Sequence, residues 1–349
     1  MATMMDYIQE EQETLVEILQ GFVPKKEERR SAIEHLMILA TGSSANACLA
    51  AKYALEKLAQ ITVTIEEPYH FNHYGHLSKE IETVLAVSQS GKSASTIDAV
   101  AHLSEQGLYT IGLSSDLESP LVQKVNERID LGTGIETVGF VTKGYVATVL
   151  QLYLLGVSIG YSKGLLSDDQ VSIIKSQLEK MIEAVPQVID KTIAFFEKNV
   201  STFKLANRFV TIGYGPNWGT AKEFETKFTE TVRVPSQGLE LEAYMHGPYL
   251  EANHEHVLFF IEATSSNQTR SQLLCDYMTS HVGKAYTITV AAAADSDTLG
   301  LDVACEELFS PLLLVIPFQI FSYLGAAAKG IDLSKRIFDD FDQVLKSKI

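Results

Sequence analysis

Residues 82–96 read ETVLAVSQSGKSAST and place a short apolar run directly before a turn rich in serine and glycine. The run Thr83–Val87 has the composition of a buried strand, and the residues after the turn have helical periodicity. Such a turn lies at the carboxyl end of a strand and at a helix N-terminus, where free main-chain N–H groups bind phosphate. Gly91 permits close approach of the backbone, and the neighbouring positions that add hydroxyl groups are Ser88, Ser90 and Ser93.

A serine-rich turn is also the pattern of an ordinary helix N-cap, and three serines alone would favour that interpretation. The added Gln89 and the preceding strand favour a phosphate site. A similar unit comes earlier, where the apolar run 36–40 ends at Thr41-Gly42-Ser43-Ser44 before a helical segment. Adjacent strand ends could bring both turns around one ligand. Strand candidates at 62–65 and 109–113 complete the pattern of a parallel, doubly wound α/β sheet.

The second half of the chain repeats this unit. The segment that begins at Arg208, RFVTIGYGPNWGTAKEFETKFTE, is again a strand, a glycine turn and an amphipathic helix, and Gly215 matches Gly42 at an offset of 173 residues. Strand-like runs follow at 257–262 and 285–290. We therefore expect two similar α/β halves. The predicted segments are an N-terminal helix (1–30), a first half (31–165), a helical connector (166–205) and a second half with a C-terminal tail (206–349).

Charge and composition limit the kinds of molecule that the protein is expected to bind and the compartment in which it is expected to work. The chain has 28 Lys and Arg against 44 Asp and Glu, a net charge of −16, which disfavours nucleic acid as a partner. Three scattered cysteines form neither a CxxC pair nor a disulfide framework, which indicates a reducing compartment. The N-terminal residues lack the pattern of a secretion signal. The apolar stretch 312–328 is interrupted by proline, glutamine and glycine, which favours a buried core helix, and we expect a cytoplasmic protein without a membrane partner.

Two groups of histidines are candidates for metal ligands. They are His70, His73 and His76, in a segment interpreted as a loop, and the pair His254 and His256. Neither group is completed by the carboxylate or cysteine spacing of a known metal site. We interpret these histidines as surface or packed residues, and we expect neither a metal nor a cofactor.

The predicted helix that contains KEFETKFTE carries a second candidate site. Glu223, Lys227 and Glu230 lie at i, i+4 and i+7 and share one helix face. A Glu–Lys pair at this spacing is usually a solvated salt bridge, whereas a buried carboxylate beside a lysine can act as a general base. His246 precedes Gly247-Pro248, a turn that can present an imidazole, although a lone histidine is more often structural.

Together these motifs resemble the sugar isomerase (SIS) domain family, in particular the isomerase part of glucosamine-6-phosphate synthase and the fructosamine 6-phosphate deglycases. The resemblance covers nearly the whole chain. The family's SQSGxS turn is matched by residues 88–93, and its Glu followed by Thr-Lys looks like Glu136 and Thr142-Lys143. In the second half, the family's histidine follows the second glutamate of the helix by 16 residues, as His246 follows Glu230.

The resemblance implies two tandem SIS subdomains and a role for each site residue. Glu230 would move a proton between neighbouring sugar carbons, with Lys227 beside it, and His246 would assist ring opening from the partner subunit of a homodimer or higher homo-oligomer. The phosphate would be held by Ser43, Ser88, Gln89, Ser90 and Ser93. The other expected substrate-binding positions are Gly42, Ser44, Gly139 and Glu223.

Two departures from the synthase pattern guide the choice of activity. Residues 2–30 supply only a short acidic helix in place of a glutaminase domain with its cysteine nucleophile. The place of the synthase's imine-forming tail lysine falls at Phe341, with Lys346 and Lys348 beyond it. These departures favour a deglycase, which releases an amine or amino acid from a phosphorylated sugar–amine. A phosphosugar isomerase, an amino-sugar phosphate deaminase and a noncatalytic sugar-phosphate-binding module remain alternatives.

Overall fold

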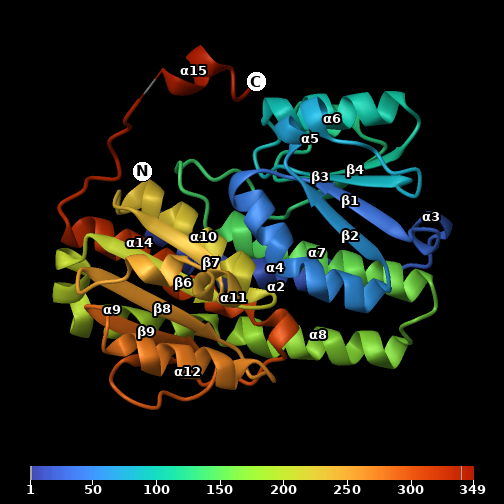
Figure 1. The fold of residues 1–349 in the computed structure, drawn as a ribbon. Helices are drawn as coiled ribbons and strands as arrows, with labels where there is room; N and C mark the ends of the chain where they lie inside the picture. The colour runs from blue at the N-terminus through green and yellow to red at the C-terminus, as the bar shows by residue number, and fades with distance from the viewer. Residues whose placement is uncertain (1, 339) are drawn as a thin grey trace. The chain divides into compact units, whose positions relative to one another are not determined.

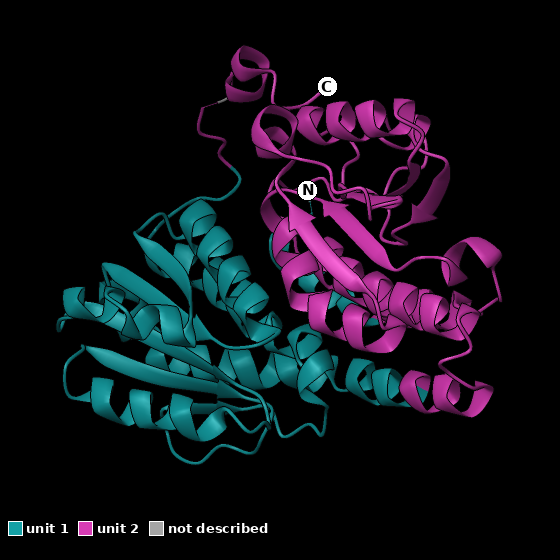
Figure 2. Cartoon of the chain, turned by 45° about the vertical axis from the view of Figure 1, so that its right-hand side comes forward, with its two compact units in different colours: residues 1–12, 176–334 teal, residues 13–175, 335–349 magenta. Residues whose placement is uncertain are grey.

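The computed structural model describes residues 2–338 and 340–349. It forms two compact units, one of residues 13–175 and 335–349 and the other of residues 1–12 and 176–334 (Figure 2). The four segments predicted from the sequence stay a prediction about domain boundaries. The compact units differ from them at the ends of the chain, because the tail from residue 335 joins the first-half unit and residues 1–12 join the second-half unit.

The first-half unit is built on a five-stranded parallel sheet of order β2-β1-β3-β4-β5. Figure 1 labels β1 to β4 of this sheet. Its strands are β1 (His35–Leu39), β2 (Thr62–Glu66), β3 (Thr83–Val87), β4 (Tyr109–Ser114) and β5 (Glu127–Asp130). Its helices are α2 (Glu11–Gly21, which begins in the other unit), α3 (Glu28–Ser31), α4 (Gly42–Ala59), α5 (Pro68–Tyr74), α6 (Ala94–Glu105), η1 (Val122–Lys124), α7 (Lys143–Ser162) and α15 (Phe341–Leu345).

Burial on both faces explains why the central strands are continuously apolar. All five residues of β3 are buried, as expected for a parallel strand covered by helices on both sides. On one face Met37 and Val84 pack in a cluster with residues of α5 and α6. The most extensive helix–helix contact in this unit is between α4 and α7, and a Cβ at Gly160 would lie 2.2 Å from the Leu58 carbonyl oxygen. This glycine therefore permits the tight packing of the two helices.

The second-half unit repeats the same strand order, β7-β6-β8-β9-β10. Its strands are β6 (Arg208–Gly213), β7 (Ser236–Glu240), β8 (His256–Glu262), β9 (Lys284–Thr289) and β10 (Thr298–Gly300). Its helices are α1 (Met4–Gln9), α8 (Asp168–Glu183, which begins in the other unit), α9 (Val185–Leu205), α10 (Asn217–Thr231), α11 (Leu241–Met245), η2 (Pro248–Glu251), α12 (Gln268–Thr279), η3 (Glu307–Phe309), α13 (Pro311–Leu314) and α14 (Ile316–Ala328).

The internal repeat predicted from the sequence is visible in the backbone as well as in the topology. Gly42 and Gly215, matched at the 173-residue offset, have φ angles of 57° and 53°, in the left-handed region that glycine favours. Both follow the first strand of their sheet and lie at the start of a helix. The predicted α/β fold of two parallel sheets flanked by helices is therefore confirmed.

An aromatic core fixes α10 against the sheet of its unit. Phe259 of β8 contacts Phe224 and Phe228 of α10 at centroid distances of 5.9 and 6.4 Å, and Phe318 and Phe321 of α14 at 5.7 and 5.8 Å. Offset and edge-to-face aromatic contacts of this kind add to the stabilisation from area burial. Since Phe224 and Phe228 point into this core, the face with Glu223, Lys227 and Glu230 has a defined orientation relative to the sheet.

The structure corrects several sequence-based expectations. The segment around His70 is not a loop but contains helix α5, which begins with Pro68 at its first turn and is capped by Glu67, whose carboxylate accepts from the His70 N–H at 2.7 Å. The predicted N-terminal helix is three helices, and Thr3 caps the first of them with a capping box. Strands β5, β7 and β10 were missed, because they are short and only partly buried and therefore lack an apolar run.

Two segments are long and apolar enough to cross a membrane by composition and length alone, Lys143–Ser162 and Glu307–Ala328. Within the described residues, 89% and 83% of their apolar windows are buried inside the protein. Core helices of this kind meet the same criterion. Their burial agrees with the prediction of a buried core helix near residues 312–328.

Candidate functional site

The SQSGKS turn is held from the end of the neighbouring strand β4. The Ser88 N–H donates to the Leu113 carbonyl at 3.1 Å, and the Gln89 carbonyl accepts from both the N–H and the hydroxyl of Ser115 at 2.9 and 2.6 Å. The Leu121 N–H donates to the Gly91 carbonyl at 3.1 Å. Within the turn, the Gly91 N–H donates to the Ser88 carbonyl at 2.9 Å.

Gly91 is the position at which the turn admits no side chain. Its φ angle is +64°, and a Cβ there would lie 2.0 Å from Oγ and 2.3 Å from Cβ of Ser119. Both the conformation and the lack of space require glycine. The tight turn places Ser90 and Lys92 at the surface, where the Lys92 N–H donates to the Ser90 hydroxyl at 3.3 Å. Ser93 precedes α6 and its hydroxyl accepts from Thr96 at 3.0 Å.

The turn after β1 lies next to the SQSGKS turn in the sheet, because β1 and β3 are adjacent parallel strands. The strand order β2-β1-β3 reverses direction between them, which makes this the topological switch point where ligands bind in open α/β sheets. Helix α4 begins at Gly42, and Thr41 before it supplies no side-chain cap. The predicted phosphate residues Gly42, Ser43 and Ser44 thus lie at the N-terminus of an 18-residue helix.

The C-terminal tail also reaches the SQSGKS turn, which the sequence did not predict. Ser93 and Lys348 form an antiparallel bridge, the Ala94 N–H donates to the Ser347 carbonyl at 3.2 Å, and the Ile349 N–H donates to the Lys92 carbonyl at 3.0 Å. The Lys348 ammonium lies 3.6 Å from Asp342 and is largely exposed. The main chain of the tail therefore takes one of the helix N-terminal donors of α6.

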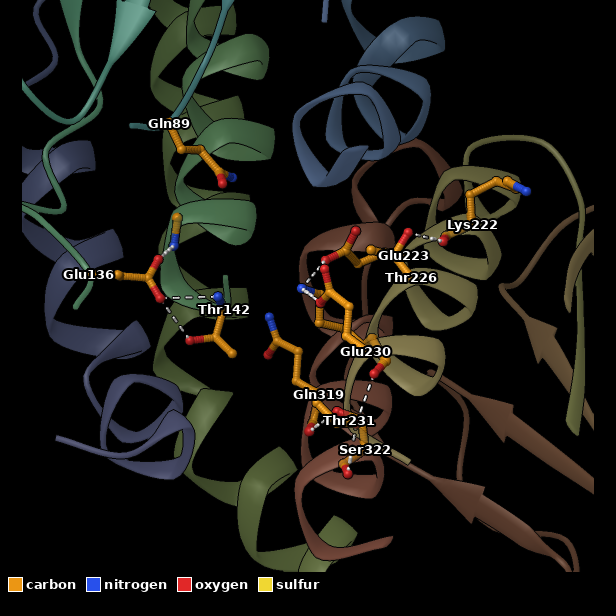
Figure 3. A network of polar contacts seen from close by, with 12 residues as sticks. Gln89, Glu136, Thr142, Lys222, Glu223, Thr226, Glu230, Thr231, Gln319 and Ser322 are labelled. Carbon is orange, nitrogen blue, oxygen red and sulfur yellow. Dashed lines mark hydrogen bonds and ion pairs between the residues drawn. The ribbon is translucent and has the colours of Figure 1, made fainter. Parts of the chain in front are cut away.

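Glu136 organises the segment that contains Gly139. Its carboxylate accepts from the Thr142 N–H at 3.1 Å and the Gly144 N–H at 2.7 Å, and Figure 3 shows its bonds to Thr142. Gly139 itself is exposed, and no described residue lies within 4 Å of where its Cβ would be. Burial raises the pKa of Glu136, although its hydrogen bonds to Gly144 and Thr142 act in the opposite direction.

The acidic face of α10 forms a compact ionic group in the second-half unit. The Lys227 ammonium lies 2.6 Å from Oε2 of Glu230 and 3.7 Å from Oε1 of Glu223 (Figure 3). The side chains of Lys227 and Glu223 are buried, with exposures of 1% and 0%, whereas the Glu230 side chain is 38% exposed. A buried lysine between two carboxylates is not the solvated salt bridge that the spacing alone suggests. Glu230 is the member of the group that solvent or a ligand can reach.

His246 lies at the end of α11 on the surface of the second-half unit. Its side chain is 79% exposed, and its Nε2 lies 3.8 Å from a carboxylate oxygen of Glu242. Gly247 has a φ angle of 135°, which turns the chain sharply after the histidine. Glu240 caps α11 by accepting from the Glu242 and Ala243 N–H groups, a contact that the sequence did not indicate because glutamate is not among the preferred N-cap residues.

The described residues contain no group of three or more His, Cys, Asp or Glu side chains placed to hold a metal ion. Two sets of predicted site residues are brought together, each within one unit. The first surrounds the switch point of the first sheet, and the second is the Glu223–Lys227–Glu230 group.

Comparison with known proteins agrees with this architecture. Residues 31–158 match the model of the SIS domain. The chain is 27% identical over 317 residues to a glutamine–fructose-6-phosphate aminotransferase (isomerizing) of Synechocystis, an alignment that covers 87% of this chain and 50% of that protein. It thus spans about half the length of the curated relatives it matches.

Two solved structures share the fold over nearly the whole chain. A protein of Clostridium difficile 630, provisionally assigned as a phosphosugar isomerase, has a TM-score of 0.91 at 22% identity and covers 99% of this chain and 98% of its own. The C-terminal domain of the glucosamine-fructose-6-phosphate aminotransferase of Francisella tularensis has a TM-score of 0.87 at 20% identity, with 94% and 96% covered. Residues 31–158 belong to the SIS domain family, and the chain is homologous to the isomerase domain of these aminotransferases.

Proposed function

We propose that the protein is a deglycase that cleaves a phosphorylated sugar–amine, of the fructosamine or glucoselysine 6-phosphate type, to a hexose 6-phosphate and a free amine or amino acid. The observation that carries the proposal is the ionic group on α10, in which the partly exposed Glu230 is held 2.6 Å from the buried Lys227 ammonium. A carboxylate fixed in this way is suited to repeated proton transfer.

The chemistry needs a base, an acid and water. From an open-chain fructosamine, Glu230 takes a proton from C1 and returns it to C2, while the C2 oxygen gains a proton and the amine nitrogen loses one, so that the ketone at C2 becomes an alcohol and a C=N bond forms at C1. Water then adds to C1 and the C–N bond breaks, so that the amine leaves and an aldose 6-phosphate remains. His246 would donate a proton for ring opening and to the departing nitrogen. Neither a cofactor nor a lysine imine is needed for this sequence.

The phosphate end of the substrate would be held at the switch point of the first sheet. Ser88, Ser90 and Gln89 follow β3, and Gly42 and Ser43 follow β1, so both groups lie at carboxyl strand ends before a helix. Helix N-termini favour anions through their free N–H groups and the helix dipole. This local preference is compatible with the overall charge of −16.

The active form would be a homodimer in which His246 serves the site of the partner subunit. Two features support this arrangement, the 79% exposure of the His246 side chain and the exposed apolar side chains of Tyr249 and Leu250 that follow it. Exposed apolar residues beside a candidate catalytic group are typical of a surface that a second subunit covers.

The deciding experiment incubates the purified protein with the 6-phosphates of fructoselysine, fructose-asparagine, glucoselysine and glucosamine, and measures released amine and hexose phosphate. We expect amine release from at least one sugar–amino acid conjugate. Turnover of glucosamine 6-phosphate alone would identify a deaminase instead, and interconversion of hexose 6-phosphates without amine release would identify an isomerase. No turnover of any of them would refute the deglycase.

A further inference from the structure

The carboxylate of Glu136 lies at the centre of a contact group that connects three parts of the first-half unit. These are the segment 137–141, the N-terminus of α7 and the Gln89 side chain. Glu136 accepts from the Thr142 N–H at 3.1 Å, the Thr142 hydroxyl at 3.2 Å and the Gly144 N–H at 2.7 Å. Both ends of the intervening segment are thereby tied to one side chain.

The same carboxylate supplies the cap that α7 otherwise lacks. Thr142 precedes this 20-residue helix and makes no side-chain cap bond of its own. A carboxylate that accepts from the first N–H groups of a helix satisfies unpaired donors and interacts favourably with the positive end of the helix dipole. Since Glu136 occupies this N-terminus, α7 does not compete with α4 and α6 for an anion.

Gly144 connects Glu136 with the SQSGKS turn, because the side chains of Glu136 and Gln89 both lie close to it. A Cβ at residue 144 would lie 2.7 Å from Oε1 of Glu136, 3.2 Å from Cγ1 of Val141 and 3.4 Å from Cδ of Gln89. The Gln89 amide in turn donates to Thr148 Oγ1 at 3.4 Å, and the Thr148 hydroxyl donates to the Gly144 carbonyl at 2.6 Å. The side chains of Glu136 and Gln89 therefore both pack against the Cα of Gly144, which carries no side chain.

We propose that Glu136 is a positioning residue for sugar-phosphate binding, because its carboxylate fixes the segment around Gly139 and, through Gly144, the Gln89 side chain. The proposal rests on the proposed function only in that the ligand is a hexose 6-phosphate. Glu136 does not touch the ligand. It sets the place of groups that do.

The test measures binding of glucose 6-phosphate and fructose 6-phosphate by calorimetry, together with thermal unfolding, for the wild-type protein and three variants. In Glu136→Gln, one of the two carboxylate acceptors becomes a donor. We expect hexose 6-phosphate affinity to fall by about ten-fold or more, since small displacements of binding groups have effects of this size. The matched control is Glu67→Gln, which removes the carboxylate cap of α5 and should leave affinity unchanged.

Gly144→Ala separates positioning from simple helix stability. Alanine is favoured over glycine within a helix by about 1 kcal/mol, which offsets stability lost where its methyl group meets the Glu136 carboxylate, and a purely structural role for Glu136 predicts unchanged binding. We expect weaker binding without a matching loss of stability, because the new methyl group displaces the Glu136 carboxylate and the Gln89 side chain. If Glu136→Gln fails to fold, this variant still decides the question.

The proposal is overturned if Glu136→Gln and Gly144→Ala both bind hexose 6-phosphate with wild-type affinity. It is also overturned if Glu136→Gln has a lower melting temperature but unchanged affinity for hexose 6-phosphate. The absence of hexose 6-phosphate binding by the wild-type protein would overturn it too. Binding by the wild-type protein without release of any amine would refute the deglycase function alone, and the comparison of variants would still test Glu136.

Discussion

Gly91→Ala should damage the SQSGKS turn by an amount that the structure allows us to estimate. The left-handed conformation at φ +64° costs a non-glycine residue about 1–2 kcal/mol. The new Cβ would also lie 2.0 Å from Oγ and 2.3 Å from Cβ of Ser119, and forcing a methyl group into a packed site costs roughly 1–3 kcal/mol. We therefore expect the free energy of unfolding to fall by about 2–5 kcal/mol.

The matched control is Gly107→Ala in the same unit. Gly107 has a φ of +91°, but no described residue lies within 4 Å of where its Cβ would be. It should lose only the conformational part, about 1–2 kcal/mol. A second variant relieves most of the clash from the other side, because Ser119→Gly deletes the two nearest of the three atoms that the new methyl group at position 91 would meet, and leaves Oγ of Ser114 at 2.8 Å. In the double variant Gly91→Ala/Ser119→Gly, we expect a favourable coupling of about 1–3 kcal/mol.

Urea unfolding of the wild-type protein and these variants measures the differences, and calorimetry with glucose 6-phosphate measures what the turn contributes to binding. Gly91→Ala should weaken binding, whereas Gly107→Ala should not. The reasoning is wrong if Gly91→Ala is no more destabilising than Gly107→Ala, or if Ser119→Gly gives no rescue.

Three further outcomes are expected. Glu230→Gln should lower turnover by roughly a hundred-fold or more while hexose 6-phosphate binding stays nearly intact, and unchanged turnover would remove Glu230 from the mechanism. A 1:1 mixture of Glu230→Gln and His246→Ala, unfolded and refolded together, should regain about a quarter of wild-type turnover if each site combines residues of two subunits. Half of the dimers are then mixed, and each mixed dimer carries one intact site out of two. No recovery would place Glu230 and His246 of one site in the same subunit. Burial lowers the pKa of His256 below its ordinary 6.5, so the stabilising contribution of neutral His256 is present above that pH and is lost as the pH falls. Between pH 7.5 and about 5.5, His256→Gln should therefore lose less free energy of unfolding than the wild-type protein. Equal losses in the two proteins, measured by urea unfolding, would contradict this.

The fold was predictable from the sequence wherever burial imposes a pattern. The strand predicted at Thr83–Val87 has those bounds in the structure, because all five of its residues are buried and all are apolar or β-branched. β5 has alternating exposure, β7 contains a glycine and β10 has three residues, so none carries such a run. Edge strands are specified by hydrogen bonds to a neighbour that is distant in the sequence, and local composition therefore says little about them.

The candidate site was predictable where its parts share one element. Glu223, Lys227 and Glu230 were expected on one helix face, and Lys227 does contact both carboxylates. Whether that face is buried depends on packing around Phe259, which helical spacing does not reveal. The contact of Ser347–Ile349 with Lys92–Ala94 joins residues about 255 positions apart through main-chain groups. Main-chain pairing leaves no side-chain signature that a sequence can show.

The two halves share a topology, but only the first has the chemistry of an anion site at its switch point. There the strand ends lead into Ser88 and Ser43, next to Gly91 and Gly42, whose φ angles are 64° and 57°. At the equivalent place in the second half, Glu262 ends β8 and is buried, and its Oε1 has no hydrogen-bond partner among the described residues. The Tyr214 hydroxyl, which follows β6, donates to the Ala263 carbonyl after β8 at 3.0 Å.

Burial raises the pKa of Glu262, which reports the poor solvation of negative charge at that position, and a phosphate would be disfavoured there for the same reason. With Tyr214 bonded across the ends of β6 and β8, the second switch point is both filled and acidic. The repeat that lacks the anion site instead provides α10, whose Glu230 carries the proposed proton transfer.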